Sequence, residues 1–309
     1  MNENNTSYTR YRNSVPIEWP TWLLILSVYG GWFVLLQYYH LLGPAIAAPL
    51  LIFICALHGS MCHELIHGHP TRIQALNNML ASVPLTLFLP YPIYRESHLD
   101  HHHDENITLP GKDPESYYCS ADEYRHKSKL GKYFAWINMT IAGRLLFSPA
   151  VEIYRLARLA LGAVKSGDAE ALKVWGVHLV SVALLLLLVV QYFQVPWWHY
   201  LLISYFASSL TRIRSFYEHR ARSAVAERTV LMEPCLFFRL LFLNLNYHLA
   251  HHENPALPWY QLGDYYHAHR SELIARSGNF FYSGYRHWLL GNLVHPVDSP
   301  IHPFDQSTG

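Results

Sequence analysis

"GPAIAAPLLIFICALHGSMCHELIH", residues 43–67, joins a long apolar segment directly to two histidines one helical turn apart. A helix needs about 20 apolar residues to cross the hydrocarbon of a membrane. Residues 43–62 supply that length without a charged side chain, and His63 and His67 follow where the segment ends. The stretch therefore predicts a transmembrane helix whose last turn carries two imidazoles, the commonest metal ligands in proteins.

The composition of the whole chain favours a membrane protein. Apolar residues make up 51% and charged residues 15% of the chain, whereas an ordinary soluble domain has about 25% charged residues. No Asp, Glu, Lys or Arg lies between Lys173 and Arg212, a length that fits two crossings. A soluble all-α protein with buried apolar hairpins is the alternative. The sequence predicts an all-α integral membrane protein with four transmembrane helices, at residues 21–39, 43–62, 174–193 and 197–214.

The basic residues predict the orientation of these helices. The turns near residues 40 and 195 contain no Lys or Arg, so all 23 basic residues lie on the other side. By the positive-inside rule that side is the cytoplasm. Residues 63–173 and 215–309 would form a cytoplasmic helical cap, and both termini would be cytoplasmic. The whole chain, residues 1–309, is predicted to be one domain, in an inner or plasma membrane.

Three further segments are apolar or amphipathic but are not predicted to cross. Residues 75–93 are interrupted by prolines and are predicted to be re-entrant or interfacial. Residues 132–164 and 232–247 are predicted to be amphipathic helices that lie along the membrane surface. The net charge of +1 gives no indication of nucleic acid binding.

Histidine stands out in the composition, because many of the 21 histidines fall into three tight groups. The first is the H-x3-H pair above, and the other two are H-x2-H-H patterns. Residues three or four apart share one face of a helix. A further histidine follows the fourth predicted span, at the depth of the first pair. The predicted metal ligands are His63, His67, His98, His101, His102, His219, His248, His251 and His252.

Nine imidazoles are too many for one metal ion. A four-coordinate zinc site would use three or four of them. Nine nitrogen ligands with few carboxylates suit two ions that accept five or six nitrogens, such as iron. The residues therefore predict a dinuclear site, with no catalytic side chain beyond the metal ligands.

The first pair also matches HExxH, the zinc-protease pattern in which the glutamate, here Glu64, is the base. That interpretation leaves seven clustered histidines unexplained, and the HxxGxxH continuation of one protease class is absent. Glu64 is instead predicted to accept a hydrogen bond from an imidazole N–H. A membrane metalloprotease and a non-enzymatic metal carrier stay as alternatives.

The histidine groups resemble the three boxes of the membrane fatty acid desaturase and hydroxylase superfamily, H-x3/4-H, H-x2-H-H and H/Q-x2-H-H. "LNLNYHLAHHENPALPWYQL", residues 243–262, resembles the third box with its usual tail, and the segment from Arg214 to His219 resembles the extra ligand segment. The resemblance covers roughly residues 20–270. Ser215 departs from it, because some members have an asparagine there, so His219 is the ligand for which the resemblance is weakest.

This resemblance implies an enzyme with two iron ions (Fe2+/Fe3+) and O2 as co-substrate. It implies a desaturase that introduces a double bond into an acyl chain or similar lipid. The alternative is a hydroxylase or ketolase-type oxygenase of the same superfamily, acting on a lipid or small amphipathic substrate. The substrate's apolar part would lie between the spans, with its polar head near the cytosol.

Such a reaction requires electrons from a separate carrier of the ferredoxin, rubredoxin or cytochrome b5 type. The chain has no His-Pro-Gly-Gly stretch, which binds the haem of a fused cytochrome b5 in this family. Its four cysteines are scattered, which argues against an internal ferredoxin or rubredoxin centre. A carrier could dock where basic residues cluster, although anionic lipid headgroups explain the same cluster equally well. The cluster consists of Arg125, Lys127, Lys129 and Lys132.

Several other polar residues near the boxes have open roles. His58, His69 and His103 are candidates for ligands or for partners of ligands, or are simply buried. Acids near the second box are candidates for orienting its imidazoles, with a solvated loop as the alternative. These acids are Asp100, Asp104 and Glu105.

Overall fold

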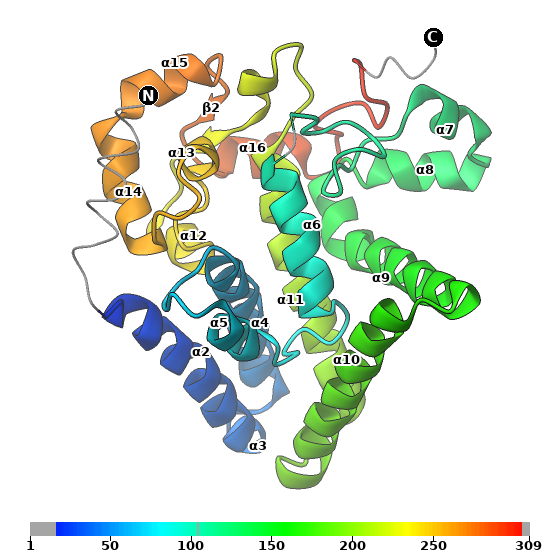
Figure 1. Cartoon of the computed structure of the whole chain (residues 1–309), viewed down its shortest axis with the longest axis vertical. Coiled ribbons are helices and arrows are strands. Elements are labelled where there is room, and N and C mark those ends of the chain that lie inside the picture. The colour runs from blue at the N-terminus through cyan, green and yellow to red at the C-terminus, as the bar shows by residue number, and fades with distance from the viewer. Residues whose placement is uncertain (1–16, 104, 305–309) are drawn as a thin grey trace.

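The computed structural model describes residues 17–103 and 105–304, and this part of the chain is mostly helical (Figure 1). A two-residue parallel pairing of β1 (Leu231–Met232) with β2 (Phe281–Tyr282) is the one departure from the predicted all-α class among the described residues. The helices are α2 (Trp19–Gln37), α3 (Tyr39–Leu42), α4 (Pro44–Ile66), α5 (Gln74–Ala81), α6 (Tyr91–His103), α7 (Ala121–His126), α8 (Lys129–Ile137), α9 (Ile141–Ser166), α10 (Ala169–Leu187), the π-helix η1 (Leu188–Tyr192), α11 (Trp197–Glu218), the 3-10 helix η2 (Val225–Arg228), α12 (Leu236–Leu241), α13 (His248–Glu253), α14 (Trp259–Ala268), α15 (Arg270–Arg276) and α16 (Arg286–Asn292).

Three helices are long and apolar enough to cross a membrane: α2, α4, and α10 continued through η1. They coincide with three of the four predicted spans. The last of them, Ala169–Tyr192, presents bare apolar side chains outward, with Leu179, Val180 and Leu184 each 61% exposed. A continuous exposed apolar surface of this kind is unfavourable in water and favourable in lipid. These helices indicate an integral membrane protein.

The fourth predicted span, residues 197–214, forms a helix but does not share this character. It belongs to α11, which packs against α4 and α9 and buries Tyr200 and Ala207 completely. The last turns of α11 carry Arg212, Arg214 and Glu218, so α11 is not among the helices apolar enough to qualify. The structure therefore gives three candidate spans, and a crossing by α11 stays a prediction.

A polar contact between helices fixes the packing of the apolar bundle. The indole N–H of Trp32 on α2 donates to the Tyr200 hydroxyl at 2.9 Å, and that hydroxyl donates to the Leu85 carbonyl at 3.0 Å. Both contacts are buried, where an unpaired polar group would cost about 1–3 kcal/mol. They join α2, α11 and the chain after α5.

Of the three segments predicted not to cross, residues 232–247 are the one whose predicted helix is wrong. Residues 75–93 contain all but the first residue of the eight-residue α5, an irregular stretch and the start of α6, so no helix of spanning length forms there. Residues 132–164 fall in α8 and α9, so the predicted helices form, and their position along the membrane surface stays a prediction. Residues 232–247 are not one helix, because Leu243 and Asn244 adopt positive φ values of 49° and 61° that end the short α12.

Candidate metal centre

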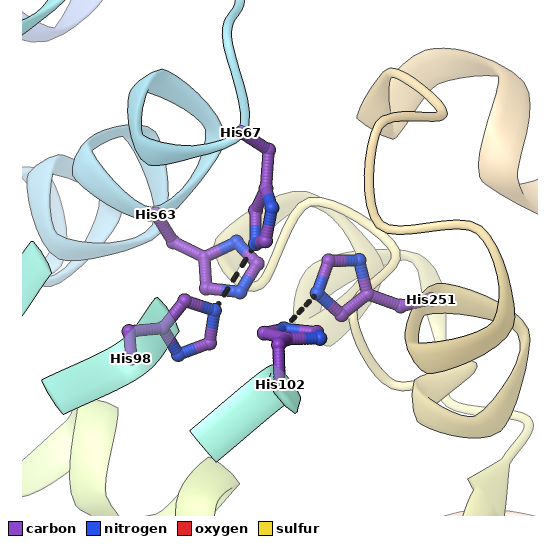
Figure 2. A group of neighbouring side chains, drawn as sticks. All are labelled: His63, His67, His98, His102 and His251. Carbon is purple, nitrogen blue, oxygen red and sulfur yellow. Dashed lines mark hydrogen bonds between the residues drawn. The ribbon is translucent and has the colours of Figure 1, made fainter. Parts of the chain in front are cut away.

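Five imidazoles from three helices point toward one centre at the end of α4 (Figure 2). The end of α4 supplies two, α6 two and α13 one. The Nε2 atoms of His67 and His98 lie 3.1 Å apart, as do those of His251 and His102. The first histidine group is His63, His67, His98, His102 and His251.

Four further imidazoles form a second group. His219, the residue that follows α11, is at its centre: its Nε2 lies 2.9 Å from His101 Nε2 and 3.0 Å from His248 Nε2. His252 Nε2 lies 3.1 Å from His248 Nε2. The second histidine group is His101, His219, His248 and His252.

The two groups together contain all nine histidines predicted from the sequence. The two H-x2-H-H helices divide their imidazoles in opposite ways. On α6, His98 and His102 join the first group and His101 the second. On α13, His248 and His252 join the second group and His251 the first. Each helix thus contributes to both groups.

The donor set fits metal ions. Both ring nitrogens of His63 are buried without a hydrogen-bond partner, an arrangement that is costly unless a metal accepts one of them. Two nitrogens about 2.1 Å from one ion are about 3.0 Å apart at a right angle and about 3.4 Å apart at the tetrahedral angle. The separations of 2.9–3.1 Å between hydrogen-bonded neighbours are of this size, so the nitrogens lie close enough to share an ion.

The imidazoles of the third box are held in the neutral form that binds metal. Burial, followed by the neighbouring imidazoles, lowers the pKa values of His248, His251 and His252 well below their usual value. His101 differs. Burial by itself would lower its pKa, but the charges of Glu115 and Asp113 outweigh burial and raise it to about 9. This corner of the site stabilises a positive charge, which a metal ion supplies as well as a proton does.

Carboxylates lie beside three of the outer ring nitrogens; those beside His98 and His101 are hydrogen-bonded to them, as second partners of metal-binding histidines commonly are, whereas the one beside His248 is not. His98 Nδ1 lies 3.0 Å from Glu115 and His101 Nδ1 2.9 Å from Asp113. His248 Nδ1 lies 3.2 Å from Glu218. Despite its burial, the neighbouring imidazoles lower the pKa of Glu115, so it carries a negative charge. The sequence analysis missed Asp113 and Glu115, because no helical spacing connects this irregular loop to the second box.

Glu64, predicted to accept from an imidazole, contacts neither group. Its Oε1 accepts the backbone N–H of Trp259 at 2.8 Å and lies 4.0 Å from His69 Nε2. That distance is too long for a hydrogen bond, and His69 Nε2 lies 3.1 Å from the Ala256 carbonyl instead, so the predicted hydrogen bond from an imidazole to Glu64 does not form among the described residues; His69 Nδ1 pairs with Glu18 at 2.8 Å. His69 belongs to neither histidine group, so these contacts join the first box to α2 and to the tail of the third box.

The remaining candidates that the structure describes lie outside the two groups. Asp100 is exposed on α6 and Glu105 is exposed in the turn after it, so only Glu105 agrees with a solvated loop. His58 lies 3.3 Å from the Tyr29 hydroxyl. Asp104 and the side chains of His103 and Ser215 lie outside the described part of the structure.

A helical protein with three membrane-length apolar helices and two mostly buried histidine groups belongs to the class of membrane proteins whose clustered histidines can bind metal. The comparison with protein families identifies the class more closely: residues 39–284, more than half of the chain, match the fatty acid desaturase family. The chain belongs to that family and is an oxidoreductase. No curated protein matches it.

Proposed function

We propose that this protein is an O2-dependent di-iron desaturase that introduces a double bond into an acyl chain or a similar lipid. The observation that carries the proposal is the convergence of nine histidines into two groups in a chain of this family. Each group would hold one iron through its Nε2 atoms. Bound iron would supply the O2-dependent oxidation of an unactivated C–H bond.

The protein's own residues would position and enclose this chemistry. Asp113 and Glu115 hold His101 and His98 in the orientation that directs their Nε2 atoms inward, and the Glu218 carboxylate lies 3.2 Å from His248 Nδ1. Arg214 in turn fixes Glu218 through a 2.6 Å ion pair one helical turn earlier. Most of the cluster imidazoles are buried, which limits the access of bulk water.

A cavity of about 570 Å³ beside the first histidine group is the candidate substrate site. None of the nine histidines lines it, but its wall includes Glu115, whose carboxylate lies 3.0 Å from His98 Nδ1 in the first group. The size lies within the range of about 300–1,000 Å³ typical of ligand pockets. Much of the lining is apolar, including Val83, Pro84, Phe88, Leu89, Phe134 and Leu156. An apolar chain fits this part.

The cavity also has a charged end, where α9 meets α11. Arg155 donates two hydrogen bonds to Glu152, at 3.0 and 3.1 Å, and Arg212 lies 3.3 Å from the same carboxylate. Two guanidinium groups therefore meet at one carboxylate, so charged side chains gather at this end. We assign it to the polar head of the substrate, so that the apolar chain extends toward the histidines.

The proposal includes four crossings, with α11 as the fourth, in a single domain of residues 1–309. Both termini and the metal centre would face the cytoplasm, where a separate carrier of the ferredoxin, rubredoxin or cytochrome b5 type would dock. The basic cluster at residues 125–132 remains the candidate docking surface. Two of its members are paired with acids one turn earlier, Arg125 with Asp122 and Lys127 with Glu123.

The decisive experiment is the mass of the product formed by iron-loaded membranes from a panel of acyl lipids with an electron-donor system. Desaturation lowers the mass by two hydrogens, whereas hydroxylation raises it by one oxygen. Loss of two hydrogens supports the proposal. An added oxygen with no double bond would replace it with the hydroxylase alternative.

A further inference from the structure

The C-terminal strap, residues 293–302, lies beyond the residues that match the family, yet it is hydrogen-bonded around the metal centre. It joins the chain near α9 where Ala142 N–H donates to the Leu293 carbonyl at 3.0 Å. It then pairs with Cys119: Cys119 N–H donates to Pro300 at 2.8 Å, and His302 N–H donates to Cys119 at 3.0 Å. Cys119 ends the loop of residues 107–119 that supplies two of the three carboxylates.

His302 reaches from the strap into this loop. Its buried ring accepts the Phe304 N–H at Nδ1, so Nε2 carries the proton and donates to the Thr108 hydroxyl at 3.0 Å. Thr108 has a φ of 76°, a conformation that a β-branched residue adopts only when its surroundings enforce it. The backbone N–H of Thr108 donates to Asp113 at 2.7 Å, and Asp113 holds His101.

A second contact of the strap reaches the other side of the second histidine group. Asp298 accepts the Tyr118 hydroxyl at 3.1 Å and lies 3.5 Å from Arg220. The same Tyr118 hydroxyl accepts the N–H of Ala221 at 3.1 Å. Arg220 and Ala221 directly follow His219, so the strap fixes the turn on which His219 depends.

We propose that the strap positions the second histidine group, with His302 and Asp298 as positioning residues, and so determines the affinity of the second metal ion. This inference rests on the proposed function, because it takes the nine histidines as metal ligands. Through Asp113 and the turn after His219, the strap reaches two of the four histidines of the second group. The first group meets the loop through His98 and Glu115 and takes its other four imidazoles from α4, α6 and α13.

The test is a metal titration of the full-length, detergent-purified protein, stripped of metal and refilled with Fe2+ under anaerobic conditions. The variants are His302→Leu, which removes the donor, and His302→Gln, whose amide N–H can still reach Thr108. His295→Leu is the matched control, because His295 is an exposed histidine of the same strap. We expect the second equivalent to bind about 10–100-fold more weakly in His302→Leu, with the first equivalent unchanged. His302→Gln and His295→Leu should keep two tight equivalents.

Two tight equivalents in His302→Leu would overturn the inference, as would equal weakening of both equivalents. If His302→Leu does not purify as a single species, Asp298→Asn decides, because it removes only the charge beside Arg220. Unchanged affinity for the second equivalent in Asp298→Asn would then reject the strap's role. Failure of the proposed function looks different: the unaltered protein itself would bind fewer than two metal ions.

Discussion

Single imidazoles of the two histidine groups are not interchangeable. His101 belongs to the second group and His251 to the first, although each follows the first histidine of its box by three residues. We predict that His101→Ala and His251→Ala each abolish turnover while the protein still inserts in the membrane, because each removes a ligand from a different ion. Activity, bound iron and the membrane-fraction yield check this. Substantial activity in either variant would remove that histidine from the ligand set.

The carboxylates near the boxes should differ in importance. Asp113 contacts His101, whereas Glu64 contacts the Trp259 N–H and His69. We predict that Asp113→Asn weakens metal binding about 10–100-fold, because it removes the charge that supports His101. Glu64→Gln should be mild, since an amide oxygen still accepts the Trp259 N–H. Metal affinity and turnover test both. An inactive Glu64→Gln variant of a protein that cleaves peptides would restore the protease interpretation.

At the scale of elements, α6 and α13 each contribute to both histidine groups. Because each helix needs both ions to satisfy its imidazoles, we predict close to two iron ions per chain after expression with ample iron. Removing the metal should lower the thermal unfolding temperature, since ligands that bind only the folded state stabilise it. Metal analysis and thermal unfolding measure this. One equivalent that does not respond to iron supply would contradict the dinuclear site.

The contact between α9 and α11 gives a prediction on substrate binding. Arg155→Gln removes one of the two guanidinium groups at the charged end of the cavity. We expect the KM for a substrate with an anionic head to rise about tenfold, the loss of one charge-assisted hydrogen bond, with kcat little changed. Arg158→Gln is the control, because Arg158 is exposed on the same helix and does not line the cavity. Equal KM values for Arg155→Gln and Arg158→Gln would mean that the polar head of the substrate binds elsewhere.

At the scale of the whole molecule, the prediction concerns sidedness. Both short turns between the predicted spans lack basic residues, so we expect Gln194 outside and Lys129 in the cytoplasm. In a background with Cys119 and Cys235 replaced by Ser, Gln194→Cys should react with an impermeant thiol reagent from outside, and Lys129→Cys should not. The same holds for Ser307→Cys, which lies outside the described residues. External labelling at Lys129 would reverse the orientation.

The sequence by itself determined the class of protein and the donor atoms. Long uncharged segments need a lipid environment wherever they fold, so composition alone predicts α2, α4 and α10 as spans. A spacing of three or four residues places histidines on one helical face in any tertiary context, so local periodicity is sufficient to identify eight of the nine members of the two groups; His219 was predicted instead from its position after the fourth predicted span. Composition was a weaker guide to α11, because a helix buried by its neighbours tolerates charges that a lipid-facing helix does not.

Only the tertiary structure decided how those histidines divide. Whether His101 joins His98 or His219 depends on how α6 faces α11 and α13, and local spacing carries no information on that orientation. The carboxylates of Asp113 and Glu115 and the strap around His302 also reach the site through irregular chain, for which no periodicity exists. Their contacts arise when segments up to 194 residues apart, Thr108 and His302, pack together, so long-range packing and not local pattern completes the metal centre.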